Sequence, residues 1–146
     1  MNGIFETRNA DETFSIGERL GATLENGDVV SLIGGLGAGK TVLAKGIAKG
    51  LGVAEEVTSP TFTLLRQYQG RLTLCHYDLY RIEDEEELEH IGFYDDLGKD
   101  SVCVIEWPQI ASGLRANIHV HITGNGNGTR QIKIISDEAK DVHTGG

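Results

Sequence analysis

Residues Ile33 to Gly46, "IGGLGAGKTVLAKG", decide how this chain is built. Within them, Gly34 to Thr41 match the pattern G-x-x-x-x-G-K-[ST] of a phosphate-binding loop. The β-branched run "VVSLIG" leads into the loop and predicts a buried strand. A helical pattern follows from about Lys40 to Leu51, and Gly52 is expected to end it. The loop therefore stands between a strand and a helix, which is the context that this motif requires.

Each part of the loop has a distinct physical task. Its glycines allow successive backbone N–H groups to face a phosphate, and the following helix adds its N-terminal dipole. Lys40 would place a positive charge on the β- and γ-phosphates, and Thr41 would offer a hydroxyl ligand to Mg²⁺. The chain lacks the Asn-Lys-x-Asp segment typical of guanine-specific proteins, which favours ATP. The residues expected to contact the nucleotide here are Gly35, Leu36, Gly37, Ala38, Gly39, Lys40, Thr41 and Val42.

Two acidic residues end predicted strands. Asp78 ends "LTLCHYD" and Glu106 ends "VCVIE". Ligands of open α/β sheets gather at the carboxyl ends of the strands, so both acids could face the phosphate loop. We expect Glu106 to hold Mg²⁺ through water, and Asp78 either to assist the metal or to orient the attacking water. Thr61 and Thr63, in "SPTFT", occupy the region of a switch in many P-loop enzymes, although composition alone predicts hydroxyls that cap turns.

The remaining patterns predict an α/β fold. A helix is expected over Glu12 to Glu25 with Asp11 as its cap, and a strand over Thr61 to Tyr68. The acidic run "EDEEELEHIGFYDDLGKD" predicts a helix followed by a loop, and "NIHVHIT" and "RQIKIIS" around "GNGNGT" predict a hairpin. Together these elements predict a P-loop NTPase-like three-layer fold, in which helices flank a mixed parallel and antiparallel sheet. We expect one domain over residues 1–136 and a polar, disordered tail over 137–146.

Composition limits the classes of function. The 146 residues carry 13 Lys and Arg against 22 Asp and Glu, a net charge of −9, so no basic surface for direct nucleic-acid binding is evident. No apolar run is long enough to span a bilayer, and the N-terminal residues do not resemble a secretory signal. Cys75 and Cys103 lie in apolar strand-like runs and are interpreted as reduced core thiols. These features favour a cytoplasmic protein.

The combined motifs resemble the TsaE family, also called YjeE, of small bacterial P-loop ATPases. The resemblance is carried by "GGLGAGKT" at 34–41, "SPTFTLL" at 59–65, "HYDLYR" at 76–81 and "IEWP" at 105–108, in this order and spacing, with "EELEHIG" at 86–92. It covers roughly residues 10 to 135. The family often has Asp where this chain has Gly35, a difference of small consequence if the backbone binds the phosphates.

The resemblance implies a function that the motifs alone do not. Members of the family are required for the threonylcarbamoyl-adenosine modification of tRNA. They bind the complex of TsaD, the transferase, with TsaB, and their ATP hydrolysis is thought to drive or reset that complex. Contact with tRNA would be indirect, in agreement with the acidic composition.

The resemblance also implies roles for single residues. Lys40 and Thr41 match the family's phosphate and Mg²⁺ residues, Glu106 its acidic Mg²⁺ residue and Asp78 its essential aspartate. Thr61 falls in the segment that could also reach the metal. Further matches are to the family tryptophan, Trp107, and to two residues expected to close over the adenine, Arg130 and Thr13.

Two other functions remain open. A small-molecule kinase shares the loop and the size, but it normally carries an arginine-bearing lid, whereas Arg66, Arg71 and Arg81 are scattered. A nucleotide-dependent binding module that hardly hydrolyses ATP is the second alternative, because no arginine finger is evident in the chain. We expect weak hydrolysis by the isolated protein and stimulation by its partners.

Overall fold

Seven strands form one mixed sheet in the computed structural model, which describes residues 1–35, 37–57, 64–125 and 127–137. The sheet order is β1-β7-β6-β2-β5-β4-β3. The strands β6, β2, β5 and β4 run parallel, whereas β1, β7 and β3 pair antiparallel with their neighbours. The strand bounds are β1 Gly3–Thr7, β2 Val29–Ile33, β3 Leu65–Gln69, β4 Thr73–Asp78, β5 Val102–Glu106, β6 Ile118–Gly124 and β7 Arg130–Ser136.

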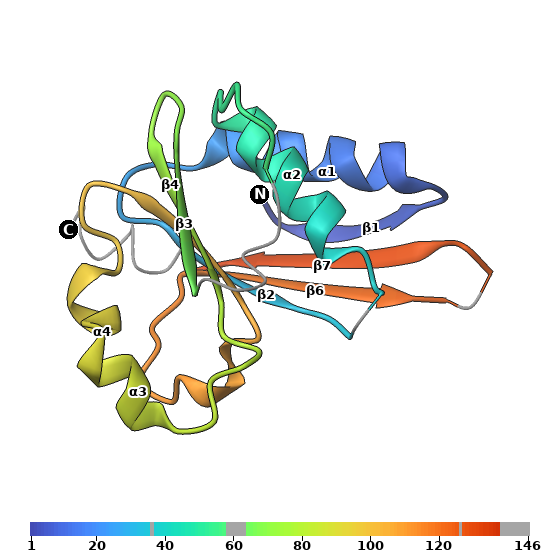
Figure 1. Cartoon of the computed structure of the whole chain (residues 1–146). Helices are drawn as coiled ribbons and strands as arrows, with labels where there is room; N and C mark the ends of the chain where they lie inside the picture. Colours follow the sequence, from blue (N-terminus) through green and yellow to red (C-terminus); the bar gives the residue numbers. More distant parts are fainter. Residues whose placement is uncertain (36, 58–63, 126, 138–146) are drawn as a thin grey trace.

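Helices cover both faces of this sheet, as Figure 1 shows. On one face lie α1 (Ala10–Thr23) and α2 (Lys40–Gly50), which bury Leu20, Leu43 and Ile47 against the sheet. On the other face lie α3 (Glu85–His90) and α4 (Phe93–Asp96), with Leu88 and Phe93 buried. Two separate apolar clusters result, one on each side of the sheet. The predicted three-layer α/β fold with a mixed sheet is confirmed.

The two helices of the first layer touch backbone to backbone. A Cβ atom on Gly17 of α1 would collide with the carbonyl oxygen of Leu43, and one on Gly46 of α2 would collide with that of Phe14. Such contacts require glycine, because any side chain would separate the helices. The close approach sets the position of α2, and α2 carries Lys40 at its first residue.

Several expected elements differ in detail. Helix α1 begins at Ala10 and is capped by Asn9, whose side chain accepts the N–H of Glu12, so Asp11 as cap was wrong. Glu12, at the third helical position, reaches back and accepts the backbone N–H of Arg8 at 2.8 Å, so it bonds the residue before the cap and not the cap itself, as a capping box would. The acidic run forms two short helices, because Gly92, with φ +72°, ends the first and begins the second.

Two further elements were not predicted. Strand β1 pairs with β7, and the short 3₁₀ helix η1 (Pro108–Ile110) follows β5. A strand was expected over Thr61 to Tyr68, and the described strand β3 begins at Leu65. Residues 61–63 lie outside the described part of the chain. Residues 138–146 of the expected tail also lie outside it.

Cys75 and Cys103 are buried and form no disulfide, in agreement with their interpretation as reduced core thiols. Over the described residues, no helix has the length and apolar character needed to cross a membrane.

Candidate nucleotide-binding site

The glycine loop connects β2 directly to α2. Gly37 and Gly39 have φ values of +76° and +105°, which glycine adopts without strain. Gly34 faces β6, where a Cβ atom would lie 2.7 Å from Ile122 Cγ2. Beside Gly35 and Gly37, by contrast, a Cβ atom would have no neighbour within 4 Å among the described residues. The loop thus packs against the sheet at its base and is open along its tip, where a phosphate could lie.

Lys40 is the first residue of α2 and is only 6% exposed. Its ammonium group has no hydrogen-bond partner among the described residues, and it lies 3.4 Å from the centroid of the Trp107 ring. Burial lowers the pKa of Lys40, while the nearby carboxylates of Glu106 and Asp78 raise it in part. A buried ammonium without a hydrogen-bonded partner is costly, and an anionic ligand would remove that cost. Thr41 is exposed beside it, and Val42 is half-buried.

The two strand-end acids lie side by side. Asp78 of β4 and Glu106 of β5 are register partners in the parallel pair, and Glu106 is in turn the partner of Leu32 at the end of β2. Glu106 is buried, whereas Asp78 is half-buried and accepts the backbone N–H of Tyr80 at 3.0 Å. Burial raises the pKa of Asp78, and Glu106 raises it further. The structure therefore brings Lys40, Asp78 and Glu106 to one edge of the sheet, as the sequence indicated.

His76, the first residue of "HYDLYR", contacts one of these acids, although the sequence predicted no role for it. Its Nε2 atom lies 2.6 Å from Glu106 Oε2, and the His76 and Glu106 side chains are 1% and 4% exposed. The sequence contains one usable signal for this contact. His76 precedes Asp78 by two residues, so alternation places both side chains on the same face of β4. The order of the strands, which makes Glu106 their neighbour, could not be read from the chain.

Arg130 and Thr13 flank the far side of the loop. The Arg130 guanidinium donates from Nε to the carbonyl oxygen of Ala38 at 2.8 Å and from Nη2 to that of Gly37 at 3.4 Å. Thr13 lies beside Gly39, and its hydroxyl is paired with that of Thr7 at 2.7 Å. Both residues therefore lie near the loop, where their side chains form hydrogen bonds to other residues of the protein. Their contact with adenine stays a prediction.

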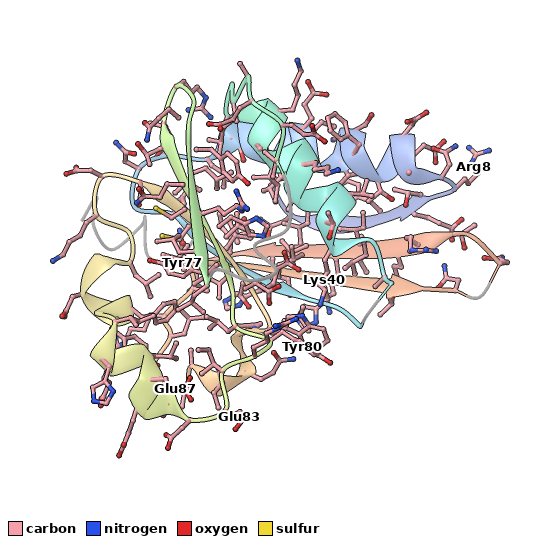
Figure 2. The ribbon with its side chains drawn as sticks, viewed as in Figure 1. Arg8, Lys40, Tyr77, Tyr80, Glu83 and Glu87 are labelled. Atoms are coloured by element: carbon pink, nitrogen blue, oxygen red, sulfur yellow. The ribbon has the colours of Figure 1, made fainter. Side chains whose placement is uncertain are left out.

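Aromatic residues cover the other side of Lys40. Trp107 has φ +56°, an unusual value for a residue with a side chain, and its ring centroid lies 4.9 Å from that of Tyr80. Figure 2 labels Lys40, at the start of α2, and Tyr80, two residues after the end of β4, and the two residues lie near each other in this view. Arg71, weighed as a lid residue, instead donates to the carbonyl oxygens of Gly21, Ala22 and Leu24 at the end of α1. It therefore holds α1 and cannot close over phosphates from this position.

The residues present fit a magnesium nucleotide. Carboxylates and a threonine hydroxyl are the hard oxygen donors that Mg²⁺ prefers, and Mg²⁺ usually keeps several waters and phosphate oxygens as ligands. No group of three His, Cys, Asp or Glu side chains that could hold a metal alone occurs within the described residues. The site thus offers a few donors beside a phosphate loop. Leu36 and Thr61, expected at the nucleotide and the metal, lie outside the described residues.

The strand, the glycine loop and the helix, together with the acids at the neighbouring strand ends, place the chain in the class of P-loop proteins. A family model described as "Threonylcarbamoyl adenosine biosynthesis protein TsaE" matches residues 7–132. The chain therefore belongs to the TsaE family.

Individual relatives agree with this assignment. A Treponema pallidum protein named "tRNA threonylcarbamoyladenosine biosynthesis protein TsaE" is 46% identical over 83% of this chain and 93% of its own length. A Bacillus subtilis protein of the same name is 43% identical over 73% of this chain and 66% of its own length. The match thus spans slightly less than two thirds of the Bacillus relative. The crystal structure of Bacillus YdiB superposes with a TM-score of 0.80 at 30% identity, covering 96% of this chain and 88% of that one.

Proposed function

We propose that this protein binds ATP and Mg²⁺ at the phosphate loop and hydrolyses ATP in support of tRNA threonylcarbamoyladenosine biosynthesis. The observation that carries the proposal is the buried ammonium group of Lys40, which has no hydrogen-bond partner among the described residues and lies beside two carboxylates and the open tip of a glycine loop. Membership of the TsaE family supplies the pathway, because its relatives bear that pathway in their names.

The residues have defined tasks in this proposal. The loop backbone from Gly35 to Thr41 holds the phosphates, and Lys40 leaves the Trp107 ring to contact the β- and γ-phosphates. Thr41 and Glu106 hold Mg²⁺, Glu106 through a water molecule. Asp78 assists the metal or accepts a hydrogen bond from the attacking water, and its half-buried position suits either task. When bound, Mg²⁺ neutralises negative charge that develops on the phosphates.

The hydrolysis serves a protein partner in this proposal. TsaD and TsaB, the partners implied by the family resemblance, would bind the ATP-loaded protein and be driven or reset by hydrolysis. Arg130 donates to the loop carbonyls and Arg71 to the end of helix α1, so neither of these two arginines extends over the loop as an arginine finger. We expect weak hydrolysis in isolation and stimulation by TsaD–TsaB. We also propose that the protein acts in the cytoplasm.

Phosphate release from ATP and Mg²⁺, measured with and without purified TsaB and TsaD, tests this function. We expect partners to raise the rate of the wild type, and Lys40→Ala and Glu106→Ala to abolish most of it. Lys49→Ala is the matched control, because Lys49 is an exposed lysine of the same helix. A rate that partners do not change, with ATP left intact, would contradict the proposal. Transfer of phosphate to a metabolite would instead indicate a small-molecule kinase.

A further inference from the structure

The buried contact between His76 and Glu106 connects the core of the sheet to the candidate metal site. His76 lies in β4 and Glu106 ends β5, and the 2.6 Å separation of Nε2 and Oε2 is that of a strong hydrogen bond to a charged group. Both side chains are almost fully buried, so water cannot replace this bond if it is broken. Without this bond, the long side chain of Glu106 could adopt several rotamers at the end of the strand.

The surroundings of the two ring nitrogens indicate which of them carries the proton. His76 Nδ1 is buried and has no hydrogen-bond partner among the described residues. A proton on Nδ1 would therefore be a buried donor without an acceptor, which is costly. A proton on Nε2 instead faces the Glu106 carboxylate, which can accept it. A proton on Nε2 alone is the arrangement that leaves no buried N–H group of the ring without an acceptor.

We propose that His76 is a positioning residue, which donates its Nε2 proton to Glu106 and fixes that carboxylate in the orientation needed to hold Mg²⁺. The inference rests on the proposed function, because it assumes that Glu106 serves the metal. Hydrogen bonds from a neighbouring side chain to a metal-binding carboxylate commonly change metal affinity about 10- to 100-fold. His76 would act in this way through Glu106 without touching nucleotide or metal.

A pair of amide variants separates positioning from packing. The amide nitrogen of His76→Gln takes about the place of Nε2 and can still donate to Glu106. The amide nitrogen of His76→Asn takes about the place of Nδ1 and cannot reach it. Binding of Mn²⁺, followed by its electron paramagnetic resonance signal in the presence of ADP, measures the metal site directly. We expect His76→Asn to weaken Mn²⁺ binding about 10- to 100-fold and His76→Gln to stay near the wild type.

The melting temperatures of both variants are measured alongside. Loss of Mn²⁺ affinity that is equal in the two variants, or wild-type affinity in His76→Asn, would overturn the inference. The wild-type protein provides a second measurement in case His76→Asn does not fold. Its ¹⁵N NMR spectrum should show a neutral His76 ring protonated on Nε2, with a slowly exchanging proton that persists when Mg²⁺ and ADP are added. A ring protonated on Nδ1 would overturn the inference without any variant.

The same titration distinguishes failure of this inference from failure of the proposed function. Glu106→Gln should lose most of the affinity for Mn²⁺ with ADP. If it binds as tightly as the wild type, the metal role of Glu106 is wrong and the role of His76 falls with it. If Glu106→Gln is weakened and His76→Asn is not, the metal role of Glu106 stands and the inference about His76 alone is wrong.

Discussion

The ammonium group of Lys40 lies 3.4 Å from the centroid of the Trp107 ring, so the indole occupies one side of the lysine that the phosphate loop presents. This cation–π contact partly compensates an ammonium that is buried without a hydrogen-bond partner in the described part of the chain. The left-handed backbone of Trp107, with φ +56°, directs the ring to this place immediately after Glu106. Phosphate binding requires the ammonium to contact phosphate oxygens instead. The distance between the Lys40 ammonium and the Trp107 ring must therefore change when a nucleotide binds.

Trp107 should therefore report nucleotide binding through its fluorescence. It is the sole tryptophan of the chain, so its emission needs no deconvolution. Adding ADP and Mg²⁺ should change the intensity and wavelength of emission, because the charge next to the ring moves. Trp107→Phe is the control and should show no such signal. Calorimetry that detects binding while the emission stays constant would contradict the expected rearrangement.

Removing the charge of Lys40 should stabilise the nucleotide-free protein. Burial lowers the pKa of Lys40, which means that the folded state disfavours its charged form. Lys40→Met keeps most of the length of the side chain without the charge, so its melting temperature should rise, by roughly 2–4 °C for each kcal/mol gained. Nucleotide binding should be lost in the same variant. Lys49→Met, on the exposed side of α2, should change stability by less than about 0.5 kcal/mol.

The stability difference between Lys40→Met and the wild type should depend on pH in a defined direction. A lysine whose pKa is lower in the folded state than its ordinary 10.5 destabilises the fold while it is charged in both states. This cost is fully present below the folded pKa and disappears as pH rises toward 10.5. Urea unfolding between pH 7 and pH 10 should therefore show that the free energy of unfolding of the wild type approaches that of Lys40→Met as the pH rises. A gap that widens with pH would contradict the buried, charged state of Lys40.

The elements closest to the phosphate loop were the easiest to predict from the sequence. The β-branched run before Gly34 and the helical pattern after Lys40 are local signals, and α2 was found at Lys40–Gly50 as expected. Strand β1 was missed because its partner β7 lies at the other end of the chain and its own residues are half exposed. The contact of His76 with Glu106 depends on β4 and β5 being neighbours, and neighbour relations are set by the whole sheet.

The glycines between α1 and α2 should be intolerant of alanine. A Cβ atom on Gly46 would collide with the carbonyl oxygen of Phe14 and lie 3.0 Å from the backbone nitrogen of Glu18. Gly46→Ala should lower the free energy of unfolding by about 1–3 kcal/mol through overpacking, although alanine is the better helix former. Chemical denaturation measures this loss. Ala22 of α1 is exposed, so the ordinary preference of helices for alanine over glycine applies there. Ala22→Gly should lower the free energy of unfolding by about 0.5–1 kcal/mol. Stabilisation by Gly46→Ala would contradict the close packing of the helices.

Arg130 should influence nucleotide affinity through the backbone of the phosphate loop. Its guanidinium donates to the carbonyl oxygens of Ala38 at 2.8 Å and Gly37 at 3.4 Å, and these contacts hold the backbone of the loop in place. A hydrogen bond from a charged group contributes about 1.5–3 kcal/mol, so Arg130→Gln should weaken ADP binding roughly 10-fold or more. Isothermal titration calorimetry measures the effect, with Arg115→Gln, at an exposed arginine, as the control. If Arg130 instead contacts adenine, its loss should weaken ADP far more than pyrophosphate. Equal losses for both ligands would indicate that Arg130 acts through the loop.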